Sequence, residues 1–267
     1  MKARLLVAAV GVPLILVVLC LLPPWATTLL FSAVGVLGCY ELFRAVGLEQ
    51  RRGAVYLSML ASAMLQFTLL LRGYAAVWAI VLPFCILLFL CWLAYYEKER
   101  EFGLTGLAAG LLCGLLVPLG LGAMGLLRSH AQGRFLVLAP LFITFIGDSG
   151  AYFAGRAFGK RKLAPKTSPN KTVAGLIGGL AAATVFFSLY GALLKLAPLW
   201  QLLPAALLAA AVAQLGDLAF SLIKRQFGVK DYGNLLPGHG GAYDRFDSLS
   251  FAAPTVLALL HVLGVMG

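Results

Sequence analysis

The chain has 267 residues, of which 61% are hydrophobic and only 12% are charged, and its mean hydropathy is +0.95. Soluble proteins carry about 25% charged residues, so this composition excludes an ordinary soluble domain and predicts an all-α polytopic membrane protein. A net charge of +11 would suggest nucleic acid as the partner of a soluble protein. Here the positive-inside rule and anionic lipid headgroups explain the excess, so we expect no nucleic acid partner.

Apolar runs separated by polar breaks predict nine membrane-spanning helices. The first run follows a basic N-terminus as a signal peptide would, but no small-residue cleavage pattern closes it, and we expect it to be retained. The five cysteines lie inside apolar runs without metal-ligand spacing and are expected to serve packing. The predicted spans are residues 5–22, 25–43, 54–71, 75–96, 104–127, 134–154, 173–196, 199–222 and 250–266.

Basic residues concentrate on one side of these predicted spans. With the N-terminus in the cytoplasm, four of the 21 Lys and Arg residues fall on the far side, namely Arg72, Arg128, Arg134 and Lys195. The other 17 fall on the cytoplasmic side. This bias predicts an N-terminus in the cytoplasm and a C-terminus outside.

Acidic residues divide the chain into two regions. Every glutamate lies in the first 101 residues, and every aspartate lies in the last 120. The cluster Glu97–Glu101 alternates in sign and is typical of a solvated helix end. We therefore predict an N-terminal transmembrane scaffold of about five helices at 1–134 and a C-terminal catalytic region at 135–267. The catalytic region contains predicted cytoplasmic loops at 155–172 and 223–249.

Two aspartates lie inside predicted spans, where an ionisable group costs about 2.5–3.5 kcal/mol and normally faces a cavity or a partner. Asp217 shares one helical stripe with Gln214, Ser221 and Lys224, at steps of three and four residues. We favour a functional role for Asp217 over an ion pair that only joins helices. For Asp148, in a glycine-rich span, close helix packing around one hydrogen-bonded acid is an equal alternative to ligand binding.

The predicted loop 155–172 carries six basic residues and no acid. Basic side chains, hydroxyl groups and backbone N–H groups near glycine are what a polyphosphate needs, although no Walker motif is present. An anchor at the lipid headgroups explains Lys160–Lys162 well. It explains the mixture of proline, hydroxyls and lysines in residues 166–172 less well.

The most polar stretch, residues 230–247, interrupts the apolar pattern a second time. Its turn Pro237–Gly241 cannot form the interior of a helix or strand, and it precedes Asp244 and Asp247, which are three residues apart. Carboxylates without cysteines suit a hard cation such as Mg²⁺ shared with substrate phosphates. Asp217 and Asp244 together predict a metal site for phosphoryl or nucleotidyl transfer, with nearby basic residues on the phosphate oxygens. These basic residues are Lys224, Arg225, Lys230 and Arg245, and His239 is a base, a phosphate ligand or a turn residue.

These residues resemble the signature of the phosphatidate cytidylyltransferases, the CDP-diacylglycerol synthases. The resemblance covers about residues 140–250, whereas the N-terminal spans match only in being hydrophobic. The signature stands here as Ser221, Lys224-Arg225, Lys230-Asp231, Pro237-Gly238-His239-Gly240-Gly241, Asp244-Arg245 and Asp247-Ser248, with Asp148, Tyr152, Gly159-Lys160 and Ser168-Pro169-Asn170-Lys171-Thr172 upstream.

The resemblance implies a membrane enzyme in which phosphatidate attacks the α-phosphate of CTP, giving CDP-diacylglycerol and pyrophosphate. It implies Mg²⁺ as the cofactor, with room for a second cation such as K⁺, and it admits a homodimer. We expect the bacterial cytoplasmic membrane, with the active site facing the cytoplasm. The implied catalytic residues are Asp217, Asp244, Lys224 and Arg245. The implied metal ligands are Asp217 and Asp244, with Asp247 and Asp148 as weaker candidates. The implied substrate-binding residues are Ser168, Lys171, Thr172, Ser221, Arg225, Lys230, Asp231 and His239.

One departure from the family pattern and three rival functions accompany this resemblance. After Lys171-Thr172 the family often has a bulky residue, glutamate and glycine, where this chain has Val173-Ala174-Gly175. Either Asp148 gains importance here or that glutamate is not essential.

The rival functions are a CTP-dependent isoprenoid-alcohol kinase, an ether-lipid cytidylyltransferase and a cation-coupled transporter. A transporter favours an internal repeat, and the sequence shows none.

Overall fold

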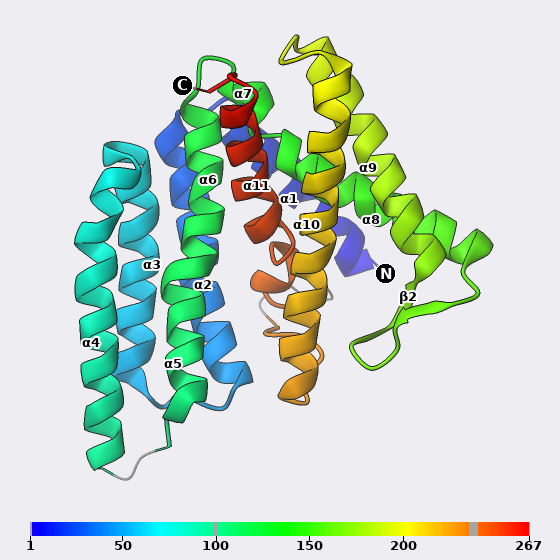
Figure 1. The fold of residues 1–267 in the computed structure, drawn as a ribbon. Coiled ribbons are helices and arrows are strands. Elements are labelled where there is room, and N and C mark those ends of the chain that lie inside the picture. The colour runs from blue at the N-terminus through cyan, green and yellow to red at the C-terminus, as the bar shows by residue number, and fades with distance from the viewer. Residues whose placement is uncertain (1, 99–100, 235–239, 267) are drawn as a thin grey trace. The chain divides into compact units, whose positions relative to one another are not determined.

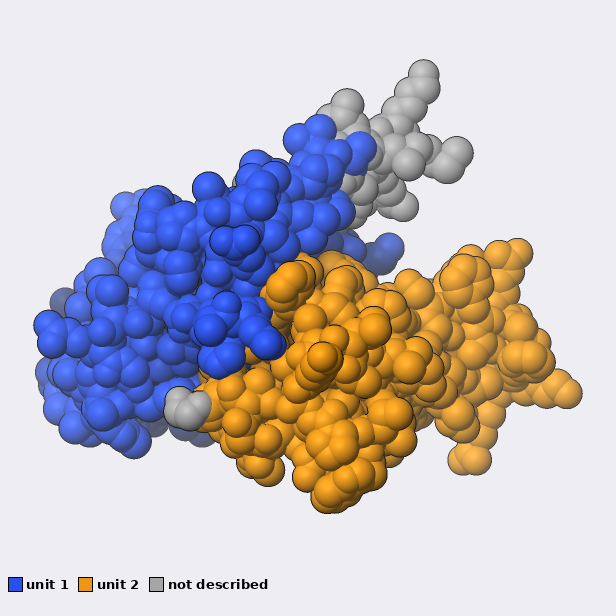
Figure 2. Space-filling model, turned by 90° about the horizontal axis from the view of Figure 1, so that it is seen from above, with its two compact units in different colours: residues 1–134, 227–246 blue, residues 135–226, 247–267 orange. Residues whose placement is uncertain are grey.

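The computed structural model describes residues 2–98, 101–234 and 240–266 and is built almost entirely of helices. The chain forms two compact units, which Figure 2 distinguishes by colour. Unit 1 comprises residues 1–134 and 227–246. Unit 2 comprises residues 135–226 and 247–267. The division between the two units thus falls within the polar stretch 230–247, after Phe246.

Unit 1 is a helical bundle in which α2 packs against α3 and α6, and α3 also packs against α4 (Figure 1). A π-helical turn joins α5 to α6, and a short 3₁₀ turn, η3, follows the polar loop. The elements are α1 (Lys2–Cys20), α2 (Pro24–Ala45), α3 (Arg52–Arg72), η1 (Tyr74–Val77), α4 (Trp78–Glu97), α5 (Gly103–Leu111), η2 (Leu112–Leu116), α6 (Val117–Ser129) and η3 (Tyr243–Arg245).

Unit 2 pairs α8 closely with α9, and α10 packs against both α9 and α11. A two-stranded antiparallel hairpin connects α8 to α9 and is seen beside the label β2 in Figure 1. The short helix α7 (Gly133–Leu136) begins at the boundary between the units. The remaining elements are α8 (Ala139–Phe158), β1 (Lys162–Ala164), β2 (Ser168–Thr172), α9 (Val173–Leu193), α10 (Leu199–Gln226) and α11 (Leu249–Val262).

Small residues allow α8 and α9 to approach closely. A Cβ atom added at Gly150 would lie 2.6 Å from the Cβ of Ala182, and one added at Gly178 would lie 2.2 Å from the Cβ of Ala154. Since real Cβ atoms do not approach so closely, the two backbones can meet only where a side chain is missing. The glycine-rich span around Asp148 therefore does pack through its glycines, as one of the two alternatives requires.

Seven helical segments in the described part of the chain are long and apolar enough to cross a membrane. They correspond to the second through eighth predicted spans. The first predicted span lies on α1, which has 19 residues, and the last forms the shorter apolar helix α11 (Leu249–Val262). The 14 residues of α11 rise only about 21 Å, less than a hydrocarbon core of about 30 Å. The polytopic all-α class is confirmed at this level, apart from the small hairpin that the apolar pattern does not reveal.

Candidate active site

Asp217 is the centre of a polar cluster in unit 2. It lies on α10, and its Oδ2 accepts a hydrogen bond from the ammonium group of Lys171. The hydroxyl of Ser221, one helical turn later, donates to Oδ1 at 3.4 Å. The Asp217 and Lys171 side chains are 26% and 23% exposed, so the ion pair is reachable from solvent. The predicted stripe on α10 is confirmed at these two positions, and the ionic partner of Asp217 comes from outside the helix.

The hairpin before α9 brings Lys171 to this position. Strand β2 ends at Thr172, whose buried hydroxyl accepts a hydrogen bond from the backbone N–H of Gly175 at 3.0 Å and so caps α9. In the turn that precedes β2, the carbonyl oxygen of Thr167 accepts a hydrogen bond from Arg225 Nε at 3.2 Å. Two predicted substrate-binding residues, Thr172 and Arg225, therefore hold the segment that presents Lys171.

Lys224 and Asp247 form a second ion pair in unit 2. Lys224 Nζ lies 3.9 Å from Asp247 Oδ2, and the two side chains are 11% and 10% exposed. Asp247 also accepts a hydrogen bond from the backbone N–H of Ser248 at 2.7 Å, just before α11 begins. The pair joins the end of α10 to the start of α11, so both residues have a structural partner beside their predicted catalytic and metal-binding roles.

The other predicted residues of unit 2 lie on α8 and on the hairpin. Asp148 lies on α8 with an exposed side chain, next to Gly147, which faces Gln214 of α10. Ser168 is half-buried and pairs with Ala164 across the hairpin. Asp148 therefore lies on the helix that packs beside α10, and its role as a metal ligand stays a prediction.

In unit 1, Asp244 sits at the base of the polar loop. Its Oδ2 accepts hydrogen bonds from the backbone N–H groups of Tyr232, at 2.8 Å, and Gly241, at 3.0 Å. The carboxylate thereby ties together the two chain segments that enter and leave the loop. Gly240 has a φ angle of +86°, and a Cβ atom there would lie 3.2 Å from Asp244 Oδ2 and 3.3 Å from Asp231 Cγ. Asp231 and Asp244 thus flank the same glycine. Only a residue without a side chain fits easily at position 240.

Three further predicted residues belong to the sequence of this loop. Lys230 and Arg245 are exposed. His239 lies outside the described residues. Asp217 belongs to unit 2 and Asp244 to unit 1, so their meeting around one metal ion stays a prediction.

A buried acid of the N-terminal region also contacts this loop, although the sequence analysis assigns that region to the scaffold. Both carboxylate oxygens of Glu41, on α2, accept hydrogen bonds from backbone N–H groups, those of Ala242 and Tyr243, at 2.9 Å each. Glu41 is only 6% exposed. Its signal in the sequence is a glutamate within an apolar span, the same feature that singles out Asp217.

The oxygen ligands fit a hard divalent cation. In the described residues, no group of three or more His, Cys, Asp and Glu side chains is arranged to hold a metal ion. Mg²⁺ needs fewer protein ligands, because it keeps several waters and shares substrate phosphates. Asp217 already holds a cationic ammonium group, and the Ser221 hydroxyl lies beside its other oxygen. The charge and the ligand type at Asp217 therefore suit Mg²⁺.

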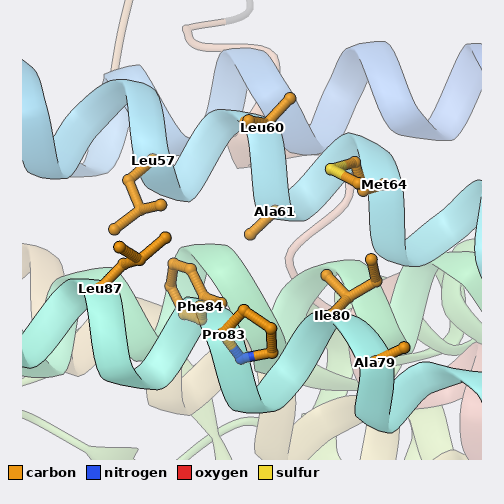
Figure 3. Close-up of a pocket in the computed structure, with 9 residues that line it drawn as sticks. All are labelled: Leu57, Leu60, Ala61, Met64, Ala79, Ile80, Pro83, Phe84 and Leu87. Atoms are coloured by element: carbon orange, nitrogen blue, oxygen red, sulfur yellow. The ribbon is translucent and has the colours of Figure 1, made fainter.

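A pocket elsewhere in unit 1 does not suit a nucleotide. Figure 3 shows nine apolar side chains lining it between α3 and α4, with a volume of about 150 Å³. Ligand pockets usually measure about 300–1,000 Å³ and include a few polar groups that orient the ligand. The candidate site therefore rests on the polar clusters and not on this pocket. The lining residues are Leu57, Leu60, Ala61, Met64, Ala79, Ile80, Pro83, Phe84 and Leu87.

Comparison with known proteins extends the similarity over the whole chain. The family described as "Cytidylyltransferase family" matches residues 2–263. A phosphatidate cytidylyltransferase of Pseudomonas aeruginosa is 39% identical over 268 residues, covering 99% of this chain and 98% of that protein. One from Haemophilus influenzae is 32% identical over 285 residues, covering 95% and 96%. One from Brucella suis is 47% identical over 145 residues, about half of each chain.

Proposed function

The chain belongs to the cytidylyltransferase family, and from that premise we propose that it transfers the CMP moiety of CTP to phosphatidate, giving CDP-diacylglycerol and pyrophosphate. The two relatives that it matches along nearly their full length carry the name phosphatidate cytidylyltransferase. The observation that carries the proposal is the ion pair of Lys171 and Asp217. It gathers a cation, a carboxylate and the Ser221 hydroxyl, and two of these residues, Lys171 and Ser221, also resemble the family signature.

The proposed reaction depends more on neutralising and orienting the anionic phosphates than on a strong base. A phosphate oxygen of phosphatidate attacks the α-phosphorus of CTP, a new P–O bond forms, and the bond to the bridging oxygen of the β-phosphate breaks as pyrophosphate leaves. The attacking phosphate is already an anion at neutral pH. Because two anions must approach each other, positive groups that neutralise and orient them provide most of the catalysis.

Basic residues of both units are the candidates for these positive groups. Lys171 lies on strand β2, which is held on both sides, by the cap at Thr172 and by the hydrogen bond from Arg225 to Thr167. A lysine on a fixed strand end can exchange a carboxylate oxygen for a phosphate oxygen without reordering its backbone. Arg225 and the exposed Lys230 and Arg245 are the further phosphate-binding candidates.

Asp217 and Asp244 are the proposed ligands of Mg²⁺, with Asp148 and Asp247 as weaker candidates and K⁺ as a second cation. When bound, the metal neutralises the phosphate oxygens and orients the triphosphate. Asp217 offers the oxygen that now holds Lys171, and Asp244 offers a carboxylate whose orientation two backbone N–H groups determine. Neither carboxylate acts as a proton acceptor in this scheme.

The membrane location follows from the seven apolar helices and the charge bias. We place the protein in the cytoplasmic membrane of a bacterium, with nine crossings, the N-terminus and active site on the cytoplasmic side and the C-terminus outside. CTP then arrives from the cytosol and phosphatidate enters from the leaflet. A homodimer is compatible with the many exposed apolar side chains, and nucleic acid is not expected as a partner.

Purified protein in detergent tests the activity directly. With phosphatidate, labelled CTP and Mg²⁺, we expect CDP-diacylglycerol and pyrophosphate in equal amounts, and no product without Mg²⁺. An ether-linked phosphatidate and an isoprenoid alcohol serve as rival acceptors in parallel reactions. Release of CDP with a phosphorylated alcohol would identify a kinase, and no CDP-lipid with any phosphatidate would refute the proposal.

A further inference from the structure

Glu41 lies in the last turns of α2, in the part of the chain that composition assigns to the scaffold. A buried carboxylate is costly unless its oxygens are satisfied. Here each oxygen accepts one hydrogen bond from the backbone, Oε1 from Ala242 and Oε2 from Tyr243. Glu41 therefore binds a backbone segment 201 residues away in the sequence, and that segment begins the turn η3.

The bound segment lies next to an N–H group that contacts Asp244. Three consecutive backbone N–H groups, from Gly241 to Tyr243, donate hydrogen bonds to two carboxylates. The first donates to Asp244 and the other two donate to Glu41. The first N–H groups of a helical turn have no partner inside the turn, so an outside acceptor decides their direction. If Glu41 releases two of these groups, the peptide plane that donates to Asp244 loses its support.

One face of α2 is shaped to receive this segment. A Cβ atom at Gly38 would lie 2.8 Å from the ring of Tyr243, which is buried. The rings of Phe31 and Phe246 meet edge to face, with centroids 5.8 Å apart. Phe31, Gly38 and Glu41 follow each other at steps of seven and three residues, so they share one helical face. The segment is thus fixed along α2 at three points.

The carboxylate of Glu41 is also enclosed by backbone. A Cβ atom at Gly233 would lie 2.4 Å from Oε1 of Glu41, and one at Gly241 would lie 2.5 Å from Oε2. Both neighbours are glycines, so the chain on either side of the polar loop closes directly on the carboxylate. Such a fit leaves Glu41 little freedom and makes the contact sensitive to a single added methyl group.

We propose that Glu41 is a positioning residue for Asp244: its carboxylate holds the backbone of residues 241–243 and thereby sets the orientation of the Asp244 carboxylate. The functional part of this inference rests on the proposed function, in which Asp244 is a metal ligand. The structural part, that Glu41 orders the base of the polar loop, stands independently of any activity.

Hydrogen exchange of the protein in detergent, without substrates or metal, tests the structural part. In Glu41→Gln one oxygen becomes an NH₂ group, which cannot accept, so the amides of residues 241–243 should exchange about tenfold faster. Glu97→Gln, at an exposed position of the same unit, is the control and should leave this peptide unchanged. Equal protection in Glu41→Gln and the wild type would overturn the proposal.

Steady-state kinetics tests the functional part. We expect Glu41→Gln to lower kcat about ten- to hundredfold and to raise the Mg²⁺ concentration for half-maximal rate, with the KM for phosphatidate unchanged. A purely structural role would reduce the amount of active enzyme and leave the Mg²⁺ dependence as in the wild type, and that result would overturn the positioning role. An inactive wild type and an inactive Glu97→Gln would refute the proposed function instead, and hydrogen exchange would still decide the contact.

Gly233→Ala provides a second route to the same contact if Glu41→Gln folds poorly. The backbone of Gly233 does not have a positive φ angle, so alanine can adopt its backbone conformation. The added methyl group would push against Oε1 of Glu41. We expect faster exchange at residues 241–243 and a raised Mg²⁺ requirement, as in Glu41→Gln. Wild-type exchange and kinetics in Gly233→Ala would contradict the proposal.

Discussion

At the scale of single residues, charged side chains inside this apolar protein have specific partners that stabilise them. Asp217 is paired with Lys171, Lys224 with Asp247, and Glu41 with two backbone N–H groups. Their exposures differ, however. Lys171 and Asp217 remain about one quarter exposed, whereas Lys224 and Asp247 are about one tenth exposed. The more accessible pair is therefore better placed to exchange partners with a substrate, and the more buried pair is better placed to hold helices together.

Asp217→Asn removes the negative charge from the accessible pair. We expect the rate of CDP-diacylglycerol formation to fall about 10²–10³-fold, since one electrostatic contact to the reacting groups is lost. The stability should change less than the rate, because asparagine keeps an oxygen that can accept a hydrogen bond from Lys171. Rates measured with labelled CTP, alongside the melting temperature, separate the two effects. A rate within twofold of the wild type would exclude Asp217 from the site.

Lys224→Met leaves Asp247 buried without this cation, and we expect a loss of about 3 kcal/mol in the free energy of unfolding. The double variant Lys224→Met/Asp247→Asn removes both charges while keeping an acceptor for the N–H of Ser248. It should recover much of the lost stability. Thermal unfolding in detergent measures both variants, and equal losses in the single and double variants would show that the pair does not couple.

At the scale of secondary-structure elements, the β1–β2 hairpin and the start of α9 together position Lys171. The hairpin has few apolar side chains, and strand β2 is held by polar contacts on both sides: the hydrogen bond from Arg225 to Thr167 in the turn and the cap at Thr172. Alternating apolar residues, the usual sign of a strand, are missing from Ser168–Thr172, so the strand is not visible in the sequence. In the proposed site the hairpin places one lysine, which requires a defined strand end rather than a buried sheet.

Thr172→Val removes the hydroxyl that caps α9 and keeps the shape of the side chain. We expect a loss of about 1 kcal/mol and faster hydrogen exchange in the first turn of α9, because the N–H of Gly175 loses its acceptor. Thr172→Ser keeps an acceptor and should behave like the wild type in both respects. If Val and Ser variants show the same protection of this turn, the cap contributes nothing to the helix start.

At the scale of the whole molecule, hydropathy specifies the membrane class but not every crossing. Seven segments have the length and apolar character of a span, whereas α11, with 14 residues, is shorter. The 19-residue α1 and α11 correspond to the first and last predicted spans. The positive-inside bias nevertheless treats them as crossings, and it predicts that loops 155–172 and 223–249 share the cytoplasmic side.

Reporter fusions test this orientation. Alkaline phosphatase is active only outside the cytoplasm and green fluorescent protein fluoresces only within it. Fused after Gly267, we expect the phosphatase to be active and the fluorescent protein to be dark. The opposite pattern would show that the C-terminus lies in the cytoplasm and that one of the nine predicted spans does not cross the membrane. A fluorescent fusion before Met1 is the matched control for the cytoplasmic N-terminus.

The sequence by itself determined the membrane class, the helical segments and the candidate acids, because composition, the length of apolar runs and charges inside them are local properties. It also placed Asp217 and Ser221 on one stripe, since helical spacing follows from residue numbers alone. Only the tertiary structure decided that Lys171 pairs with Asp217, 46 residues away, and that Glu41 binds the backbone beside Asp244, about 200 residues away. Partners so distant in the chain are chosen by how helices pack, and no local pattern encodes that choice.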